Sequence, residues 1–237
     1  MRQRRPSRAI VLDRDGTLMH NCHYCRDPEQ VQLLPGVSAA LGWLSGAGYR
    51  LVVVTNQSGV ARGHVSERQL ARVHERLRRI LVAEGIPLEA IYYCPHHPEG
   101  SRSGYAEHCL CRKPEPGLLL RAAFECGFAL AASWFVGDIL ADVEAGNRAG
   151  CRTVLLDLGT EPRPETALQT PAYVARNLPH AARLILAADG RSRRKVEPLP
   201  LAALDRPCLT QGVLRPGDPS PIPTAQWVTQ AALEGAQ

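Results

Sequence analysis

Two carboxylates stand close together near the N-terminus, where an apolar stretch ends. The segment DRDGT, residues 13–17, places Asp13 and Asp15 two positions apart directly after residues 9–12. One carboxylate can attack an electrophile while the other transfers protons. A phosphate monoester dianion repels a carboxylate nucleophile, so this chemistry requires a metal ion and a lysine near phosphorus. Because such a pair alone is more often a turn or capping signal, the rest of the chain must supply those cations.

Three later segments complete this chemistry. Asp138 and Asp142 lie four residues apart at the start of a predicted helix, which suits them to holding or orienting Mg²⁺. Thr55 and Asn56 offer a hydroxyl and an amide to phosphate oxygens, and Lys113 is the candidate cation. Together these residues predict a magnesium-dependent phosphatase.

The order of these motifs resembles the haloacid dehalogenase superfamily of phosphatases. Three longer segments are similar to one of its families, the D,D-heptose 1,7-bisphosphate phosphatases, which have no large cap domain: TNQSGVARG at 55–63, YCPHHP at 93–98 and CLCRKP at 109–114. The resemblance covers roughly residues 9–160. It implies hydrolysis through a phospho-aspartate intermediate.

The resemblance also implies roles for individual residues. Asp13 is expected to be the nucleophile and Asp15 the general acid and base. The expected Mg²⁺ ligands are Asp13, Asp15 and Asp138. The expected phosphate and substrate contacts are Asn21, Tyr24, Thr55, Asn56, Gln57, Ser58, Arg112 and Lys113.

Soft ligands at C-x-H and C-x-C spacing predict a structural zinc site that orders a loop insertion. The four ligands are Cys94, His96, Cys109 and Cys111. A closed site of this kind leaves no open position for chemistry, so the zinc is expected to aim Arg112 and Lys113 at the substrate. His97 is the competing imidazole, but the resemblance favours His96. Free loop thiols are the alternative interpretation.

The sequence departs from the family pattern at two places. Ile139 stands where the family usually has a substrate-contacting lysine, which leaves Lys113 as the principal cation. A second C-x-x-C pair, Cys22 and Cys25, lies in the loop after Asp15. We expect reduced thiols there rather than a second metal or redox pair. His64, His74 and His180 are expected to be packing or surface residues.

Apolar runs of strand length alternate with helical segments, which predicts an α/β fold. The expected architecture is a Rossmann-like, doubly wound parallel sheet with helices on both faces. Predicted strands cover 9–13, 50–56, 90–94, 133–138 and 151–157, and predicted helices cover 36–47, 66–84, 116–126 and 140–149. The expected domains are a basic tail (1–8), the phosphatase domain (9–188) and a proline-rich, disordered tail (189–237).

Composition limits the other classes of function. The chain has 237 residues, a formal net charge of +5 and no apolar run as long as a membrane span, so we expect a cytoplasmic protein without membrane contact. Aromatic residues make up 5%, which argues against a stacking platform for nucleic acid and so against a polynucleotide-end phosphatase. Eight cysteines suggest metal binding in a reducing compartment. We expect a monomer.

Two sister activities share these motifs: removal of the 7-phosphate from a heptose bisphosphate and hydrolysis of histidinol phosphate. Residues 97–108 separate His96 from Cys109, as in the heptose enzymes, whereas histidinol phosphatases carry a shorter loop. The sequence therefore favours a phosphorylated heptose substrate, used in nucleotide-activated heptose biosynthesis.

Overall fold

Six parallel strands form the sheet at the centre of the protein, and the computed structural model describes residues 7–190 of the chain. Their order across the sheet is β3-β2-β1-β4-β5-β6. In chain order they are β1 (Ala9–Leu12), β2 (Arg50–Asn56), β3 (Leu88–Cys94), β4 (Trp134–Gly137), β5 (Arg152–Leu156) and β6 (Tyr173–Ala175). The order reverses beside β1, so the crevice for a ligand is expected beyond the carboxyl end of this strand.

Helices cover both faces of the sheet because alternate strand side chains point to opposite sides. Ile10 and Leu12 of β1 belong to a core shared with α1 (Val37–Gly46), α2 (Glu67–Ala83) and α5 (Leu178–Ala188). On the opposite face, Ala9 and Val11 join a core with α3 (Gly117–Cys126) and α4 (Leu140–Arg148). The short 3-10 helices are η1 (Pro28–Gln30), η2 (Leu130–Ala132) and η3 (Ala167–Gln169).

The predicted parallel α/β sheet is confirmed, with differences at its far edge. All five predicted strands and all four predicted helices are present within two residues of the expected bounds. Ser66, the first residue of the predicted helix 66–84, caps α2, since its hydroxyl accepts a hydrogen bond from Gln69 N–H. The sequence did not predict β6 and α5, which complete the sheet and one helical layer.

The ends of the described chain pack against the domain. Arg8, which the sequence assigned to the basic tail, forms an ion pair with Asp189 at 3.4 Å, and its guanidinium lies 4.0 Å from the ring centre of Tyr49. Residues 1–6 and 191–237 of the predicted tails lie outside the described residues. Within residues 7–190, no helix combines the length and the apolar character needed to cross a membrane.

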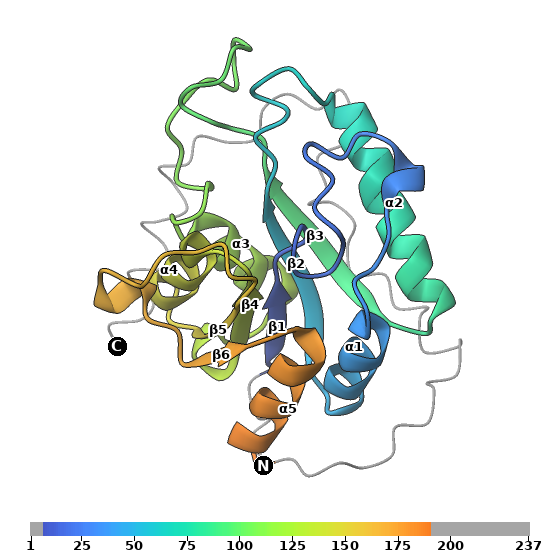
Figure 1. The fold of residues 1–237 in the computed structure, drawn as a ribbon, viewed down its shortest axis with the longest axis vertical. Helices are drawn as coiled ribbons and strands as arrows, with labels where there is room; N and C mark the ends of the chain where they lie inside the picture. The colour runs from blue at the N-terminus through green and yellow to red at the C-terminus, as the bar shows by residue number, and fades with distance from the viewer. Residues whose placement is uncertain (1–6, 191–237) are drawn as a thin grey trace.

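Three irregular segments stand together at the upper end of the sheet in Figure 1, following β1, β2 and β3. They are joined by direct contacts: the carbonyl of Ala61 accepts hydrogen bonds from the backbone of Ser101 and Arg102, both at 2.9 Å. Tyr24, from the first segment, stacks on His64, with ring centres 4.7 Å apart. The fold thus gathers the segments that carry the predicted site residues.

Candidate active site

Asp13 lies directly beyond β1 and is buried against a single lysine. Its backbone N–H donates to the carbonyl of Val136 in β4, which extends the hydrogen bonding between β1 and β4 by one residue beyond β1. Lys113 Nζ lies 2.6 Å from Asp13 Oδ1, 2.6 Å from Asp142 Oδ1 and 3.1 Å from the carbonyl oxygen of Val54. Burial lowers the pKa of Lys113, but the two carboxylates outweigh it and raise the pKa overall. Lys113 is therefore a fixed cation beside Asp13.

Three carboxylates share this buried space, and their charge exceeds that of the lysine. Oxygen atoms of Asp13, Asp138 and Asp142 lie within 4.8 Å of one another. Burial, together with the neighbouring carboxylates, raises the pKa of Asp13 to about 6 and that of Asp138 to about 8. Lys113 opposes both shifts. A divalent cation with a preference for hard oxygen ligands fits such a cluster, because it would offset the remaining negative charge.

Gly16 makes room for this cluster. Its φ of +74° is left-handed, and a Cβ built on it would lie 2.2 Å from Asp138 Oδ2. The hydroxyl of Thr17 donates to the other oxygen, Asp138 Oδ1, at 3.2 Å. The DRDGT segment therefore shapes the site with its glycine and threonine as well as its aspartates.

The carboxylate of Asp15 lies outside the cluster of Asp13, Asp138 and Asp142, and the predicted role of Asp15 as a Mg²⁺ ligand stays a prediction. Arg14 Nη2 donates to Asp15 Oδ2 at 2.8 Å, and Gln57 Nε2 donates to the same oxygen at 2.9 Å. These bonds turn the carboxylate toward Arg14, and Asp142 takes the place of Asp15 among the clustered carboxylates. Thr55, which is buried, accepts from Gln57 Nε2 at 3.1 Å.

Asn56 holds the backbone of Lys113 instead of presenting a free amide. Its Nδ2 donates to the carbonyl oxygen of Lys113 at 3.0 Å, and its Oδ1 accepts from the Lys113 N–H at 3.1 Å. Both side-chain amide atoms are thus occupied, and the predicted contact of Asn56 with phosphate stays a prediction. The residue orients the lysine across a sequence separation of 57, a contact that no local pattern reveals.

The four predicted zinc ligands come together between β3 and α3. The Sγ atoms of the three cysteines lie 3.2–3.5 Å apart, and His96 Nδ1 lies 3.3 Å from Cys111 Sγ. Tetrahedral Zn–S bonds of about 2.3 Å would place sulfurs about 3.8 Å apart, close to this arrangement. His96 Nε2 lies 3.3 Å from Glu107 Oε1, a carboxylate that orients the ring with Nδ1 toward the sulfurs. The donor set therefore fits zinc.

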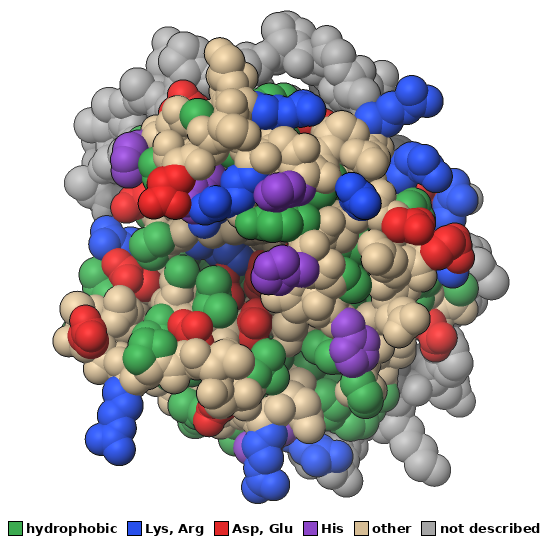
Figure 2. All heavy atoms as spheres, turned by 45° about the horizontal axis from the view of Figure 1, so that its top comes forward, with side chains coloured by type: hydrophobic (Ala, Val, Ile, Leu, Met, Phe, Trp, Pro, Cys, Tyr) green, Lys and Arg blue, Asp and Glu red, His purple; other side chains and the backbone are tan. Residues whose placement is uncertain are grey.

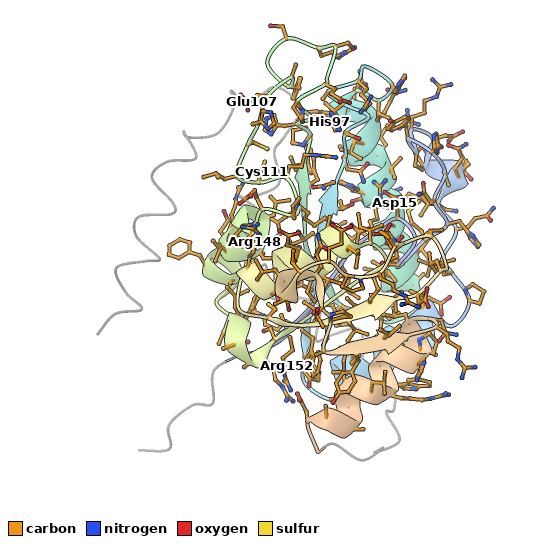
Figure 3. The ribbon with its side chains drawn as sticks, turned by 60° about the vertical axis from the view of Figure 1, so that its left-hand side comes forward. Asp15, His97, Glu107, Cys111, Arg148 and Arg152 are labelled. Carbon is orange, nitrogen blue, oxygen red and sulfur yellow. The ribbon has the colours of Figure 1, made fainter. Side chains whose placement is uncertain are left out.

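His97 lies outside that cluster. Arg62 Nη2 lies 3.2 Å from His97 Nε2, and burial together with Arg112 and Arg62 lowers the pKa of His97. Figure 3 places His97, Glu107 and Cys111 at the same end of the molecule, above Asp15. The structure thus brings His96, rather than His97, to the thiols.

Comparison with known proteins identifies the family. The HAD-hydrolase-like family model matches residues 110–181. The D-glycero-beta-D-manno-heptose-1,7-bisphosphate 7-phosphatase of Pasteurella multocida (strain Pm70) is 40% identical over 178 residues, which cover 75% of this chain and 96% of the relative. The chain belongs to the heptose bisphosphate phosphatase family. This family consists of phosphoric monoester hydrolases with the HAD-like fold.

Two further relatives of this phosphatase support the same family. The enzyme of the same name from Escherichia coli (strain K12) is 42% identical over 158 residues, covering 66% of this chain and 83% of the relative. The crystal structure of D,D-heptose 1,7-bisphosphate phosphatase from B. bronchiseptica, complexed with magnesium and phosphate, is 33% identical. It superposes with a TM-score of 0.64 over 76% of this chain and 99% of that one.

The remaining predicted contacts of the phosphatase surround the same end of the sheet. Tyr24 is half-buried, whereas Asn21 is exposed and its Oδ1 accepts from the N–H of His23. Arg112 Nη1 donates to the carbonyl of His96 at 3.4 Å, and Ser58 is half-buried in the segment after β2. Acidic, basic and histidine side chains gather around a hollow on this face (Figure 2). Their roles in substrate binding stay predictions.

Cys22 and Cys25 have free thiols, as expected. Cys22 Sγ donates to the carbonyl oxygen of His20 at 3.3 Å, and Cys25 packs in the core. Neither joins a metal-competent group among the described residues. Sequence reasoning missed the buried Arg14, which donates to Asp15, and the buried His74, which contacts Arg14. The only available signal was the central arginine of DRDGT.

Proposed function

We propose that this phosphatase removes the 7-phosphate of D-glycero-D-manno-heptose 1,7-bisphosphate through an aspartyl phosphate on Asp13. The observation that carries the proposal is the buried ion pair of Asp13 and Lys113 beside Asp138, at the carboxyl edge of the sheet. The family's heptose bisphosphatases supply the substrate class. The reaction then serves the synthesis of nucleotide-activated heptose.

The first chemical step transfers the phosphoryl group to the protein. A carboxylate oxygen of Asp13 attacks phosphorus, and the bond from phosphorus to the sugar O7 breaks. The departing oxygen takes a proton from Asp15, so the sugar leaves as an alcohol. Lys113 offsets negative charge at the reacting centre from a fixed position, which needs no rearrangement during the step.

The second step releases inorganic phosphate. A water oxygen attacks phosphorus of the aspartyl phosphate, the proton from this water passes to Asp15, and the bond to the Asp13 oxygen breaks. This restores the Asp13 carboxylate and the protonated Asp15, so one side chain acts as acid and then as base.

Two metal ions complete the proposal. Mg²⁺ would be held by Asp13 and Asp138, and when bound it supplies positive charge beside the phosphoryl oxygens. Asp142 lies in the same cluster but is paired with Lys113. Zn²⁺ would be held by the Cys94, His96, Cys109 and Cys111 set and would support the loop that leads into Arg112.

Phosphate release across a substrate panel tests the substrate assignment. The panel contains both anomers of heptose 1,7-bisphosphate, histidinol phosphate and a 5′-phosphorylated oligonucleotide, each with Mg²⁺. We expect the highest kcat/KM on a heptose bisphosphate, with the 1-phosphate retained in the product by ³¹P NMR. A higher kcat/KM on histidinol phosphate would assign the chain to the sister activity instead.

A further inference from the structure

A closed hydrogen-bonded ring surrounds the carboxylate of Asp15. Arg14, whose side chain is 1% exposed, donates from Nε and Nη2 to Asp15 Oδ1 at 3.2 and 3.0 Å. Its Nη2 also donates to Gln57 Oε1 at 3.0 Å, and Gln57 Nε2 returns a bond to Asp15 Oδ2 at 2.9 Å. Both oxygens of Asp15 are therefore oriented by Arg14 and Gln57.

His74 closes the remaining side of Arg14. It lies on α2, and its Nε2 is 3.0 Å from Arg14 Nη1. A guanidinium has only N–H donors and stays protonated, so His74 Nε2 must be the acceptor and the imidazole is neutral. Burial, with the nearby Arg14 and Arg78 guanidinium groups, holds the pKa of His74 well below its ordinary value. His74 is thus a permanent acceptor for Arg14.

The burial of this pair explains why the acceptor matters. Without His74, the Nη1 group of Arg14 would be left buried with a missing hydrogen bond, which is costly enough to favour a different position of the guanidinium. Asp15 is the outermost member of the group, at 22% side-chain exposure, and would move with the arginine that holds both its oxygens.

We propose that His74 is a positioning residue for catalysis, which acts through Arg14 to aim the carboxylate of Asp15 at the leaving-group oxygen. The inference rests on the proposed function, because that function assigns proton transfer to Asp15. The ring of His74 lies 5.5 Å from that of Tyr93, a contact that packing alone would explain. The inference goes further because it gives this buried histidine a part in the chemistry.

The choice of leaving group separates this role from a purely structural one. A sugar alkoxide leaves poorly without a proton, whereas p-nitrophenolate leaves as a stable anion. The ratio kcat/KM reports the steps up to the formation of the aspartyl phosphate, before water attacks. Misaligned Asp15 should therefore lower kcat/KM for the sugar phosphate far more than for p-nitrophenyl phosphate.

The experiment compares His74→Leu with His74→Gln. Leucine fills the space without an acceptor, and glutamine restores an oxygen near the position of Nε2. For His74→Leu we expect kcat/KM for heptose bisphosphate to fall about 10- to 100-fold, since a general acid contributes 10²- to 10⁴-fold. We expect kcat/KM for p-nitrophenyl phosphate to stay within about twofold. His74→Gln should recover most of the loss on the sugar.

Equal losses on both substrates in a folded His74→Leu protein, or no rescue by glutamine, would overturn the proposal. If His74→Leu fails to fold, His74→Asn serves in its place, because its shorter amide stays polar but ends too far from Arg14; the same split is expected. If the wild type does not hydrolyse heptose bisphosphate, the variants are compared on another alkyl phosphate that it does hydrolyse. A wrong substrate therefore shows in the wild type, and a wrong role for His74 shows in the variants.

Discussion

Most side chains in the site are positioned by hydrogen bonds or ion pairs to one another, and these contacts determine which roles the sequence could predict. Asp13, Asp138 and Lys113 meet where the motif order places them. The side-chain amide of Asn56, in contrast, is hydrogen-bonded to the backbone of Lys113. Asp15 is drawn out of the metal-competent cluster by Arg14. A motif gives the residue types at the strand ends, whereas hydrogen-bond partners depend on contacts between distant segments.

Gly16 gives a residue-scale prediction. In Gly16→Ala, the new Cβ would meet Asp138 Oδ2 at 2.2 Å, so the carboxylate must move. We expect weaker Mg²⁺ binding and a loss of about 100-fold in kcat/KM, since a misplacement of about 1 Å can cost this much. Mg²⁺ titration of activity measures both effects.

Gly85→Ala is the matched control for this substitution. Gly85 has a similar φ of +71°, but a Cβ there would meet nothing within 4 Å. It should cost about 1–2 kcal/mol of stability through backbone strain and leave the kinetics unchanged. Equal kinetic loss in the two variants would show that strain, not the displacement of Asp138, is responsible.

At the scale of elements, the strands were predictable because each buried strand is a continuous apolar run ended by a polar or glycine-containing turn. β6 was not predicted from the sequence because it has only three residues, two of them exposed. α5 carried signals that could have found it: Asn177 accepts from the N–H of His180 as an N-cap, and Pro179 stands in the first turn. The zinc-loop geometry fits the predicted ligands, but its further ties to Ala61 and Glu67 were not visible in the sequence.

The two proposed metals should separate by ligand chemistry. Mild EDTA treatment is expected to remove Mg²⁺ first, and activity should return when Mg²⁺ alone is added, while zinc stays bound. Cys109→Ser should lose zinc, keep its sheet and lose activity that added Mg²⁺ does not restore. Hydrogen bonds from the loop to other segments should keep the variant folded. One of them runs from the Tyr105 hydroxyl to Glu67 Oε2 at 3.1 Å. Elemental analysis and circular dichroism measure these outcomes.

Cys22→Ser provides the control, because this thiol lies outside the four-ligand cluster. It should retain zinc near one equivalent and normal kinetics. Absence of zinc from the purified wild type, or normal kcat/KM in Cys109→Ser, would reduce the cluster to ordinary loop residues.

Across the described residues, the candidate site and the contacts around residues 8 and 189 lie toward opposite ends of the sheet, as Asp15 and Arg152 show in Figure 3. Asp189 accepts a hydrogen bond from Tyr49 and pairs with Arg152 at 2.9 Å and with Arg8 at 3.4 Å. A chain that ends after residue 190 keeps these contacts. We therefore expect unchanged kcat and KM for this truncation; a large fall in kcat in a folded protein would show that the removed segment contributes to the site.

Asp189 itself predicts a pH-dependent stability. Burial raises its pKa, but Tyr49, Arg152 and Arg8 outweigh this and lower the pKa below the ordinary 3.8. A lowered folded-state pKa stabilises the protein above the unfolded value, and this stabilisation is lost as pH falls through the folded value. Asp189→Asn should lower Tm by about 2–4 °C at pH 7, with the difference shrinking below about pH 4. An equal Tm difference at pH 7 and pH 3 would contradict this.

The most direct test of the account is to trap phosphate on Asp13 during turnover. Heptose 1,7-bisphosphate and Mg²⁺ are mixed with the enzyme, the reaction is quenched in acid within milliseconds, and borohydride reduces any aspartyl phosphate to homoserine for peptide mass spectrometry. The account predicts homoserine at position 13 in the wild type and none in Asp13→Asn, which should also be inactive yet folded. Homoserine at another aspartate, or turnover by Asp13→Asn at a tenth of the wild-type rate or more, would contradict it.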